Sequence, residues 1–258
     1  MPYELQGTVL ITGASAGIGA ACARAFAAAG ARLILAARRT DRLDALAGEL
    51  RAAHGTQTLL VELDVRDVGV VTHVLTDLPA GWTDVDVLVN NAGLGRGTER
   101  LHEGNSAEWD EMIDTNVKGL LYVTRAVVPG MVRRGRGHVI NLGSLAGHEV
   151  YPGGAVYCAT KHAVDALTRG LRMDLAGSGV RVSSVDPGMV QTDFSTVRFR
   201  GDQARAAQVY AGMTPLTAGD VADTVLYCAT RPPHVVIADV VMMPVDQQST
   251  TQVHRRPA

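Results

Sequence analysis

The sequence contains few cysteines, and those it has are far apart. Cys22, Cys158 and Cys228 are odd in number and form no C-x-x-C pair. They exclude a disulfide framework and a cysteine-ligated metal site, and they favour a reducing compartment, so we expect a cytoplasmic protein. Cys158 follows Tyr157 directly, but neighbours on a helix point about 100° apart, so we expect a small buried side chain there.

Targeting and membrane signals are also missing. Residues 1–5 lack the basic region and apolar core of a signal peptide, and no uncharged apolar run approaches the roughly 18 residues of a membrane span. Lys and Arg number 24 against 26 Asp and Glu, so no basic surplus suggests nucleic acid or an anionic membrane. No linker divides the 258 residues, so we expect one domain, 1–258.

Short apolar runs alternate with segments of helical period. Continuous apolar strands between helices are typical of a parallel sheet covered on both faces, and right-handed crossovers give a doubly wound, Rossmann-type α/β fold. The predicted helix Ser106–Arg134 contains Pro129, where we expect a kink or a break. The other predicted helices are Gly17–Ala29, Asp41–Ala53 and Gly154–Ala176, and the predicted strands are Thr8–Ile11, Arg32–Ala37, Thr58–Asp64, Val85–Asn90, His138–Leu142, Val180–Val185 and Val235–Met242.

A glycine-rich turn follows the first predicted strand, with Gly13, Gly17 and Gly19 in the segment 12–19. The glycines let the backbone turn sharply and approach a pyrophosphate. The start of the next helix offers unpaired N–H groups and the positive end of the helix dipole. The spacing alone also fits an ordinary strand–helix turn, but its position after the first strand favours dinucleotide binding.

Two arginines end the second predicted strand, where an acidic residue usually accepts the ribose hydroxyl of NAD. A guanidinium of Arg38 or Arg39 would pair instead with the 2′-phosphate of NADP; a solvated surface pair is the alternative. Asn91, Ala92 and Gly93 follow the fourth strand at its carboxyl end, where open α/β sheets bind ligands. We therefore predict NADP as the cofactor and no metal.

A tyrosine and a lysine share one face of the predicted helix 154–176. Tyr157 and Lys161 are four residues apart, and Ser144 lies thirteen residues before Tyr157. An ammonium near a phenol favours the phenolate and lowers the tyrosine pKa from about 10 toward neutral pH, where an acid–base group works best. A helix-surface pair is the alternative, but the combination with a dinucleotide turn predicts a redox enzyme.

In order and spacing these motifs resemble the short-chain dehydrogenase/reductase family over nearly the whole chain. The resemblance implies a cofactor-binding part at about 1–140 and a catalytic and substrate part at about 141–258. The matching motifs are Thr12-Gly13-x-x-x-Gly17-x-Gly19, Asp64-Val65, Asn90-Asn91-Ala92-Gly93, Asn116, Ser144, Tyr157-x-x-x-Lys161 and Pro187-Gly188.

The resemblance implies four catalytic roles. Tyr157 would exchange a proton with the substrate oxygen, Lys161 would lower the pKa of Tyr157 and bind the nicotinamide ribose, Ser144 would polarise the substrate oxygen, and Asn116 would hold a water that links Lys161 to solvent. The residues expected around the cofactor are Gly13, Ser15, Gly17, Ile18, Gly19, Arg38, Arg39, Asp64, Val65, Asn91, Ala92, Gly93, Tyr157, Lys161, Pro187, Gly188, Val190 and Thr192.

A finer similarity concerns the substrate. The stretches 112–144, 194–202, 242–245 and 253–256 resemble those of bacterial NADP-dependent 3-hydroxy acid dehydrogenases, which implies activity on short 3-hydroxy acids such as serine, allo-threonine or 3-hydroxypropionate. The alternatives are a reductase of larger aldehydes or ketones, and a noncatalytic NADP-binding regulator.

A 3-hydroxy acid carries a carboxylate, which needs a cation or several N–H donors in a dry pocket. Arg198 and Arg96 are the candidates for this cation. Ser144, Val150 and Tyr151 are expected at the substrate, with His148 nearby as an exposed loop residue.

The long predicted helices indicate that the chain forms an oligomer. Apolar residues on more than one face of Ser106–Arg134, namely Leu120, Leu121, Val123, Val127 and Val128, suggest that a partner covers one face. The family resemblance implies that this helix and Gly154–Ala176 form a dimer face, and that 235–245 supplies a second interface of a homotetramer; burial within the same chain is the alternative.

Overall fold

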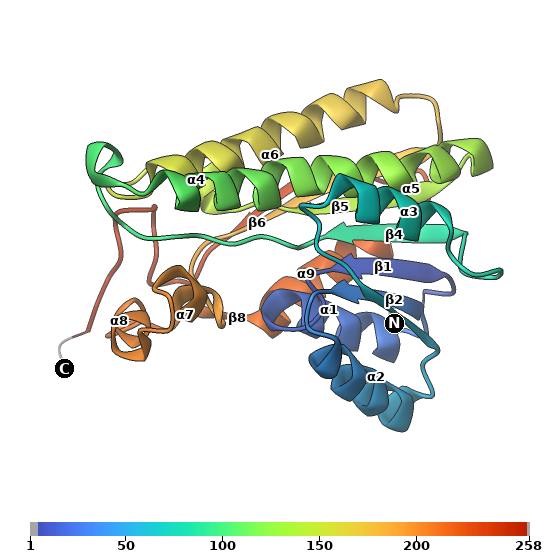
Figure 1. The fold of residues 1–258 in the computed structure, drawn as a ribbon, viewed down its shortest axis with the longest axis horizontal. Coiled ribbons are helices and arrows are strands. Elements are labelled where there is room, and N and C mark those ends of the chain that lie inside the picture. Colours follow the sequence, from blue (N-terminus) through green and yellow to red (C-terminus); the bar gives the residue numbers. More distant parts are fainter. Residues whose placement is uncertain (1–4, 257–258) are drawn as a thin grey trace.

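The computed structural model describes residues 5–256, in which seven parallel strands form one sheet (Figure 1). Residues 1–4 and 257–258 lie outside the described part. The prediction that no signal peptide is present concerns residues 1–5 and so falls mostly outside it. The strand order is β3-β2-β1-β4-β5-β6-β9, the reversal at β1 and β4 being that of a doubly wound fold. The strands are β1 Thr8–Thr12, β2 Arg32–Ala37, β3 Thr58–Glu62, β4 Val85–Asn90, β5 Gly137–Leu142, β6 Val180–Pro187 and β9 Asp239–Met242.

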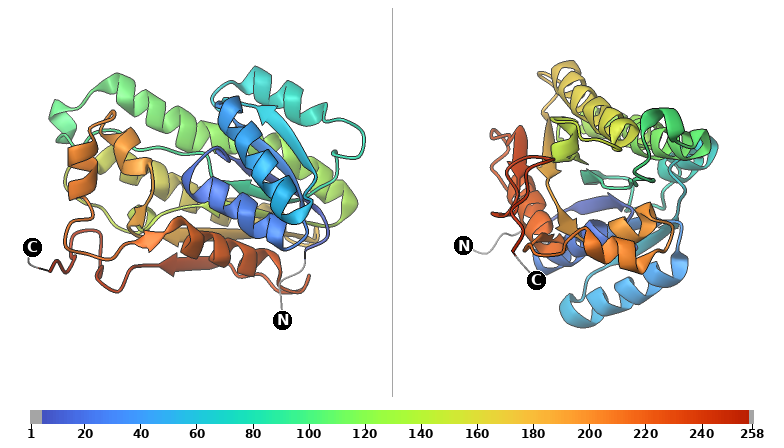
Figure 2. Two further views of the ribbon diagram at one scale, coloured as in Figure 1. Left: turned by 90° about the horizontal axis from the view of Figure 1, so that it is seen from below. Right: turned by 90° about the vertical axis from the view of Figure 1, so that its left-hand side faces the viewer.

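Helices cover both faces of the sheet, as the two turned views make plain (Figure 2). One face carries α1, α2 and α9, and the other carries α3, α5 and α6, with α4 packed beside α6. The principal helices are α1 Gly17–Ala28, α2 Thr40–His54, α3 Val68–Thr76, α4 Ser106–Ile113, α5 Leu120–Arg134, α6 Ala155–Asp174 and α9 Ala218–Ala229. Shorter elements are α7 Phe194–Arg198, α8 Gln203–Gln208, the 3-10 turns Leu101–Glu103 (η1) and Leu145–Gly147 (η3), and the strand pair β7 Val190–Gln191 and β8 Leu216–Thr217.

The alternation of side chains along β1 divides the core in two. Val9 and Ile11 pack into the cluster under α1, α2 and α9, while Leu10, between them, packs into the cluster under α3 and α5. All three are fully buried. A strand that is apolar at every position therefore fits because both of its faces are covered.

The long helix predicted for 106–134 is interrupted, but not at the proline. Between α4 and α5 lies a π-helical turn, Asp114–Gly119, whereas α5 continues through Pro129 without a break. Proline removes one N–H donor, and here the rest of α5 holds the helix. The interruption lies instead where Asn116 turns inward and where Gly119 approaches Val65 so closely that a Cβ would lie 2.6 Å from its side chain.

The last strand is shorter than predicted. It begins at Asp239 rather than at Val235. The carbonyl of Val235 accepts a hydrogen bond from the Arg181 side chain at 3.0 Å instead of joining a strand ladder. The residues that were expected to extend this strand therefore form a loop along the edge of the sheet.

The apolar residues that suggested a partner along 106–134 are mostly covered by the chain itself. Leu120, Val123, Val127 and Val128 are buried, and the last three belong to the core under α3 and α5. Leu121 alone of these five remains exposed, at 41%. The argument that these residues need a second subunit was therefore wrong for four of the five, because the sheet and neighbouring helices cover them.

Candidate active site

One cavity of about 570 Å³ opens at the carboxyl ends of β1, β2, β4, β5 and β6. Residues from both predicted parts of the chain line it, so the topology brings the glycine-rich turn and the Tyr157 helix to one place. The predicted residues in its lining are Gly13, Ser15, Gly17, Ile18, Arg38, Arg39, Asp64, Val65, Asn91, Ala92, Gly93, Ser144, Tyr151, Tyr157, Lys161, Pro187, Gly188, Val190, Thr192 and Arg198. Gly19, Asn116, Val150 and Arg96 are not in the lining.

The glycine-rich turn is packed too tightly for side chains. Gly13 has a φ of 65°, and a Cβ there would lie 2.9 Å from Nδ2 of Asn91, while a Cβ on Gly19 would lie 2.4 Å from the Gly13 carbonyl oxygen. The Asn91 amide donates to the Thr12 carbonyl at 2.9 Å and so fixes β4 against this turn. Ala16, just before α1, has no side chain that could cap the helix, so the first N–H groups of α1 face the cavity.

Positive charge gathers at the end of β2. Arg39 donates to the Ser15 hydroxyl through Nε and Nη2, at 3.2 and 3.0 Å. Burial and then the neighbouring Arg42 and Arg38 lower the pKa of Arg39, against the opposing charge of Asp193. Within residues 5–256 no carboxylate forms an ion pair with Arg38 or Arg39. This end of the cavity is therefore built to accept an anion.

Asp64, also in the lining, has a partner of its own. Arg66 binds its carboxylate, with Nη2 at 2.6 Å from Oδ2, and this hydrogen bond holds the pKa of Asp64 below its usual range. Its negative charge is thus compensated locally rather than directed at an incoming ligand.

Tyr157 lies at the other end of the cavity, on the first turn of α6. Burial raises the pKa of this phenol above its ordinary value, and nearby Tyr151 adds to the rise, while the Ser144 hydroxyl and the positive charge of Arg198 oppose it. The ring of Phe194 lies 5.5 Å away, centroid to centroid. The net lowering of the Tyr157 pKa that the sequence led us to expect is therefore absent, because desolvation of the phenol outweighs the groups that favour the phenolate.

Lys161 is buried one turn further along α6. Its ammonium donates to the carbonyl of Leu142, at the end of β5, at 2.8 Å. Burial lowers the lysine pKa to about 8, and Asp186 acts in the opposite direction. Burial thus brings the titration of this lysine from strongly alkaline to mildly alkaline pH.

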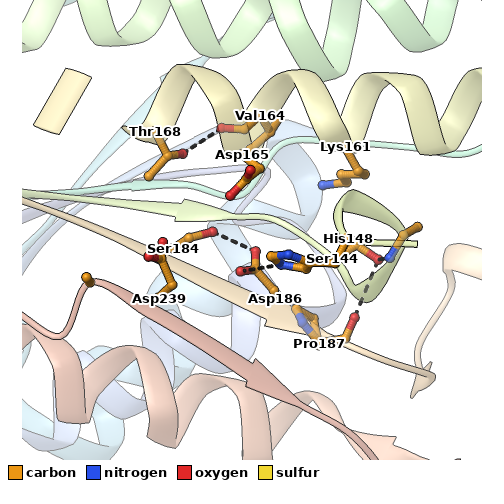
Figure 3. A network of polar contacts seen from close by, with 12 residues as sticks. Ser144, His148, Lys161, Val164, Asp165, Thr168, Ser184, Asp186, Pro187 and Asp239 are labelled. Carbon is orange, nitrogen blue, oxygen red and sulfur yellow. Dashed lines mark hydrogen bonds and ion pairs between the residues drawn. The ribbon is translucent and has the colours of Figure 1, made fainter. Parts of the chain in front are cut away.

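Ser144 follows β5 and begins the turn η3. Its hydroxyl donates to the Pro187 carbonyl at 3.4 Å and accepts from the Ala146 N–H at 3.1 Å, as Figure 3 shows in part. Ser144 is thus both the N-cap of η3 and a group in the cavity lining that interacts with Tyr157.

Asn116 lies behind the cavity wall, within the π-helical turn. Its side-chain oxygen accepts from the Leu94 N–H at 2.8 Å, and its nitrogen donates to the Leu94 carbonyl at 2.8 Å and to the Thr160 hydroxyl at 3.0 Å. The amide therefore fixes the loop after β4 to α6, directly beside Lys161. Its role in holding a water stays a prediction.

The two arginine candidates differ in where they point. Arg198 lies in the cavity lining, with its guanidinium carbon 5.6 Å from the centre of the Tyr157 ring, and its Nε donates to the Gly97 carbonyl at 2.9 Å. Its Nη2 is buried without a hydrogen-bond partner among the residues that the structure describes. Arg96, by contrast, grips Glu111 with two bonds, 2.7 and 3.0 Å long, and also donates to the Val197 carbonyl. Arg96 is therefore a structural residue outside the cavity.

Comparison with known proteins identifies the family. The family model described as short chain dehydrogenase matches residues 7–203. The chain belongs to the short-chain dehydrogenase family. It is 49% identical to the NADP-dependent 3-hydroxy acid dehydrogenase of Salmonella typhi, over 96% of this chain and 99% of that protein. It is 42% identical to the serine 3-dehydrogenase of Agrobacterium fabrum, over 97% and 99%. A solved structure titled the closed form of serine dehydrogenase complexed with NADP+ has a TM-score of 0.90 at 45% identity, covering 96% of this chain and 100% of that one.

The loop between Ser144 and Tyr157 differs from expectation at Val150 in this short-chain dehydrogenase. Val150 is 69% exposed and points away from the cavity, and its carbonyl accepts from the Thr250 hydroxyl at 3.3 Å. His148 is an exposed residue, as expected, but its side chain keeps 25% of its surface and its Nε2 lies 3.1 Å from the Asp186 carboxylate. The buried carboxylate holds the imidazole inward.

Several cavity residues carry no local signal in the sequence. Phe194 and Tyr210 come from the segment after β7, and Gln247 and Thr250 from the C-terminal loop. Gln247 is buried and accepts from the Met189 N–H at 2.8 Å. Only the fold of the short-chain dehydrogenase brings these residues into the cavity that Tyr157 lines. No cluster of His, Cys, Asp or Glu that could hold a metal ion occurs within 5–256, and no helix there is long and apolar enough to cross a membrane.

Proposed function

We propose that the protein is an NADP-dependent oxidoreductase that interconverts a short 3-hydroxy acid and the corresponding 3-oxo acid. The observation that carries the proposal is the position of Arg198 in the lining of the cavity that Tyr157 also lines, with its guanidinium carbon 5.6 Å from the centre of the Tyr157 ring. No carboxylate among residues 5–256 forms an ion pair with Arg198, so a substrate carboxylate in the cavity would supply the partner for this cation. The names of the relatives, 3-hydroxy acid dehydrogenase and serine 3-dehydrogenase, agree with an acid of this size.

The cofactor end of the cavity fits NADP. The 2′-phosphate would meet Arg38, Arg39 and the Ser15 hydroxyl, and the pyrophosphate would meet the glycine-rich turn and the start of α1. When bound, NADP supplies or accepts the hydride. The Salmonella typhi relative is named as NADP-dependent, and a structural neighbour is described as complexed with NADP+, which supports NADP over NAD here.

In this proposal the chain's own residues transfer one proton and stabilise the phenolate that the transfer leaves. In the reducing direction the Tyr157 phenol gives its proton to the substrate oxygen, while Ser144 donates a hydrogen bond to that oxygen. Because burial favours the neutral phenol, the acid form is the one ready at neutral pH. The charged Lys161 stabilises the phenolate that results, and Asn116 holds the backbone beside Lys161 in place.

The proposal is tested by measuring NADPH oxidation by the pure protein on malonic semialdehyde, on larger aldehydes and on ketones without a carboxylate, and NADP reduction on serine and 3-hydroxypropionate. Preference for the acids by at least tenfold in kcat/KM is expected. Preference for bulky uncharged carbonyls would instead favour the alternative of a reductase for larger aldehydes. NADPH binding without turnover on any compound would favour a noncatalytic regulator.

We also propose a homotetramer in the cytoplasm that binds no nucleic acid. Leu121, Val132 and Met173 remain exposed on α5 and α6, and Val241 and Val245 remain exposed at the C-terminal edge; together they offer two apolar faces. The three free cysteines and the net charge of −2 agree with the other two points. Light scattering should give four times the 27.2 kDa of one chain, and a mass of one chain at micromolar concentration would refute the assembly.

A further inference from the structure

A buried carboxylate lies just behind the catalytic end of the cavity. Asp186, near the end of β6, is 1% exposed and is not part of the cavity lining. It packs against the start of the Ser144 loop so closely that a Cβ on Gly143 would lie 1.7 Å from Oδ1 of Asp186. Only glycine fits at 143, so the carboxylate is held directly beneath the residue that precedes Ser144.

Two donors hold this carboxylate in place. The Ser184 hydroxyl donates to Oδ1 at 2.6 Å, and Nε2 of His148 lies 3.1 Å from Oδ2 (Figure 3). Burial raises the pKa of Asp186, and the bonds from Ser184 and His148 and the charge of Lys161 oppose that rise. Each of these three contacts favours the charged form of the carboxylate.

Lys161 lies across the turn η3 from Asp186. Gly147 in that turn packs on the Lys161 backbone, where a Cβ would lie 2.8 Å from the carbonyl oxygen. Within the described part of the chain, Asp186 is the one charged group found to oppose the effect of burial on the Lys161 ammonium.

Two other carboxylates lie near Asp186 and Lys161, and each of them pairs with an arginine. Asp165, on α6, pairs with Arg169 at 3.0 Å, and Asp239, on β9, pairs with Arg172 at 2.9 Å. Both are drawn beside the network in Figure 3. Their charges are thus matched by arginines, whereas the charge of Asp186 faces His148 and Lys161.

We propose that Asp186, held by His148 and Ser184, is a positioning residue that keeps the Lys161 ammonium charged beside the reacting phenol. The role of Asp186 in catalysis rests on the proposed function. The effect of Asp186 on the charge of Lys161 does not depend on that function. In the reducing direction the active form has a neutral Tyr157 and a charged Lys161. Without the Asp186 charge, Lys161 loses its proton at lower pH, so activity should fall at lower pH as well.

The composition allows a direct test, because the chain contains two lysines, Lys118 and Lys161. Protein labelled with [ε-¹³C]lysine gives two signals, and Lys118→Arg identifies the one that belongs to Lys161. Lys118 is an exposed residue paired with Asp114 at 2.8 Å, so its signal is an internal reference. The pH midpoint of the Lys161 signal is then compared between the unmodified protein and Asp186→Asn.

We expect Asp186→Asn to lower the Lys161 midpoint by about 1 pH unit or more, as is typical of losing an opposite charge nearby. The matched control is Asp165→Asn, which removes a carboxylate four residues from Lys161 on the same helix and should leave the midpoint unchanged. Asp186→Ser, smaller and also uncharged, replaces Asp186→Asn if that variant does not fold. An unchanged Lys161 midpoint in the folded variant, or an equal shift in Asp165→Asn, overturns the proposal.

The pH profile of NADPH-dependent reduction adds the catalytic readout. The alkaline limb of kcat/KM should move to lower pH in Asp186→Asn by the same amount as the Lys161 midpoint, whereas a purely structural defect would lower activity at every pH. If the unmodified protein reduces none of the substrates, the proposed function fails while the lysine titration still stands. If the unmodified protein is active and the Lys161 midpoint does not move, the inference about Asp186 fails alone.

Discussion

The two ends of the cavity handle charge in opposite ways. At the end of β2, Arg38 and Arg39 are exposed, and one of them is held by a neutral hydroxyl, that of Ser15. At the catalytic end, Tyr157 and Lys161 are removed from water, and burial is the largest influence on the pKa of each. At the first end water and salt screen each charge, so keeping it ionised costs little free energy. At the second end each charge is desolvated and is stabilised only by a specific neighbour.

The difference teaches where mutational effects should be large. An exposed contact contributes little because water competes for it, and a buried one contributes more because losing it leaves a desolvated group without a partner. Substitutions at the catalytic end should therefore change rates and pH dependence sharply. Substitutions at the phosphate end should change cofactor preference by smaller steps.

The largest effect is expected at Tyr157. Tyr157→Phe removes only the hydroxyl, so the fold and NADPH binding should persist, while turnover should fall by about 10²- to 10⁴-fold, as is usual for an acid–base group. Steady-state rates measure the loss, and NADPH fluorescence checks the binding. If turnover stayed within a few fold of that of the unmodified protein, the proton donor would be another group. The conclusion that substitutions at the catalytic end have the larger effect would then fail.

Arg198 should come next, and its effect should depend on the substrate. Arg198→Leu removes a half-buried cation that the substrate would cover further, so kcat/KM for a 3-hydroxy acid should fall on the order of 100-fold, the range for breaking a charge pair that binding buries. Activity on an alcohol without a carboxylate should change little. Arg205→Leu is the matched control, because Arg205 packs on Phe199 and bonds Thr98 but is not itself in the cavity lining. An equal loss on both kinds of substrate would show that Arg198 only supports the structure.

A smaller effect is expected at the phosphate end. Arg38→Asp should weaken NADP by about 1–3 kcal/mol, the range for a charge-assisted hydrogen bond, while NAD binding should hold or improve. Titrations with both cofactors measure the change, and raising the salt concentration should reduce the NADP advantage of the unmodified protein. Equal kcat/KM for NADP and NAD before any substitution would contradict the role of both arginines.

His138 sharpens the comparison by showing burial without a catalytic task. It lies on β5, 1% exposed, with Nε2 2.7 Å from the Ser183 hydroxyl, and burial lowers its pKa to about 3. The folded protein holds this ring neutral, so its contribution to stability is complete above about pH 6.5 and is lost as pH falls toward 3.

The expected loss is about 1.4 kcal/mol of unfolding free energy for each pH unit below 6.5. Urea unfolding of the protein and of His138→Gln at pH 7.0 and 5.5 measures it: the two stabilities should approach each other by about 1.4 kcal/mol at the lower pH. A constant difference between the two proteins would mean that His138 does not titrate on unfolding.

The fold and the phosphate end were accessible from the sequence because their signals are local. The apolar strands, the glycines at 13 and 19 and the pair Arg38 and Arg39 each lie within one short segment. The catalytic end required contacts across the chain: Arg198 reaches Gly97, and His148 reaches Asp186. The hydrophobic periodicity of the sequence does not reveal such contacts. For the same reason the sequence did not show that Arg96 is paired with Glu111, which makes it a poor candidate for binding a substrate.

The π-helical turn at Asp114–Gly119 has a consequence for insertions and deletions. Such a turn amounts to one extra residue within an otherwise continuous helix. Deleting a single residue there would restore regular α-helix, and each residue of an α-helix accounts for about 100° of rotation. The whole of α4 would then turn by that angle relative to α5, and Asn116, within the turn itself, would move away from Leu94. A gene that loses one codon in this stretch would thus lose the site rather than shorten a loop, so the length of this helix is as tightly constrained as its sequence.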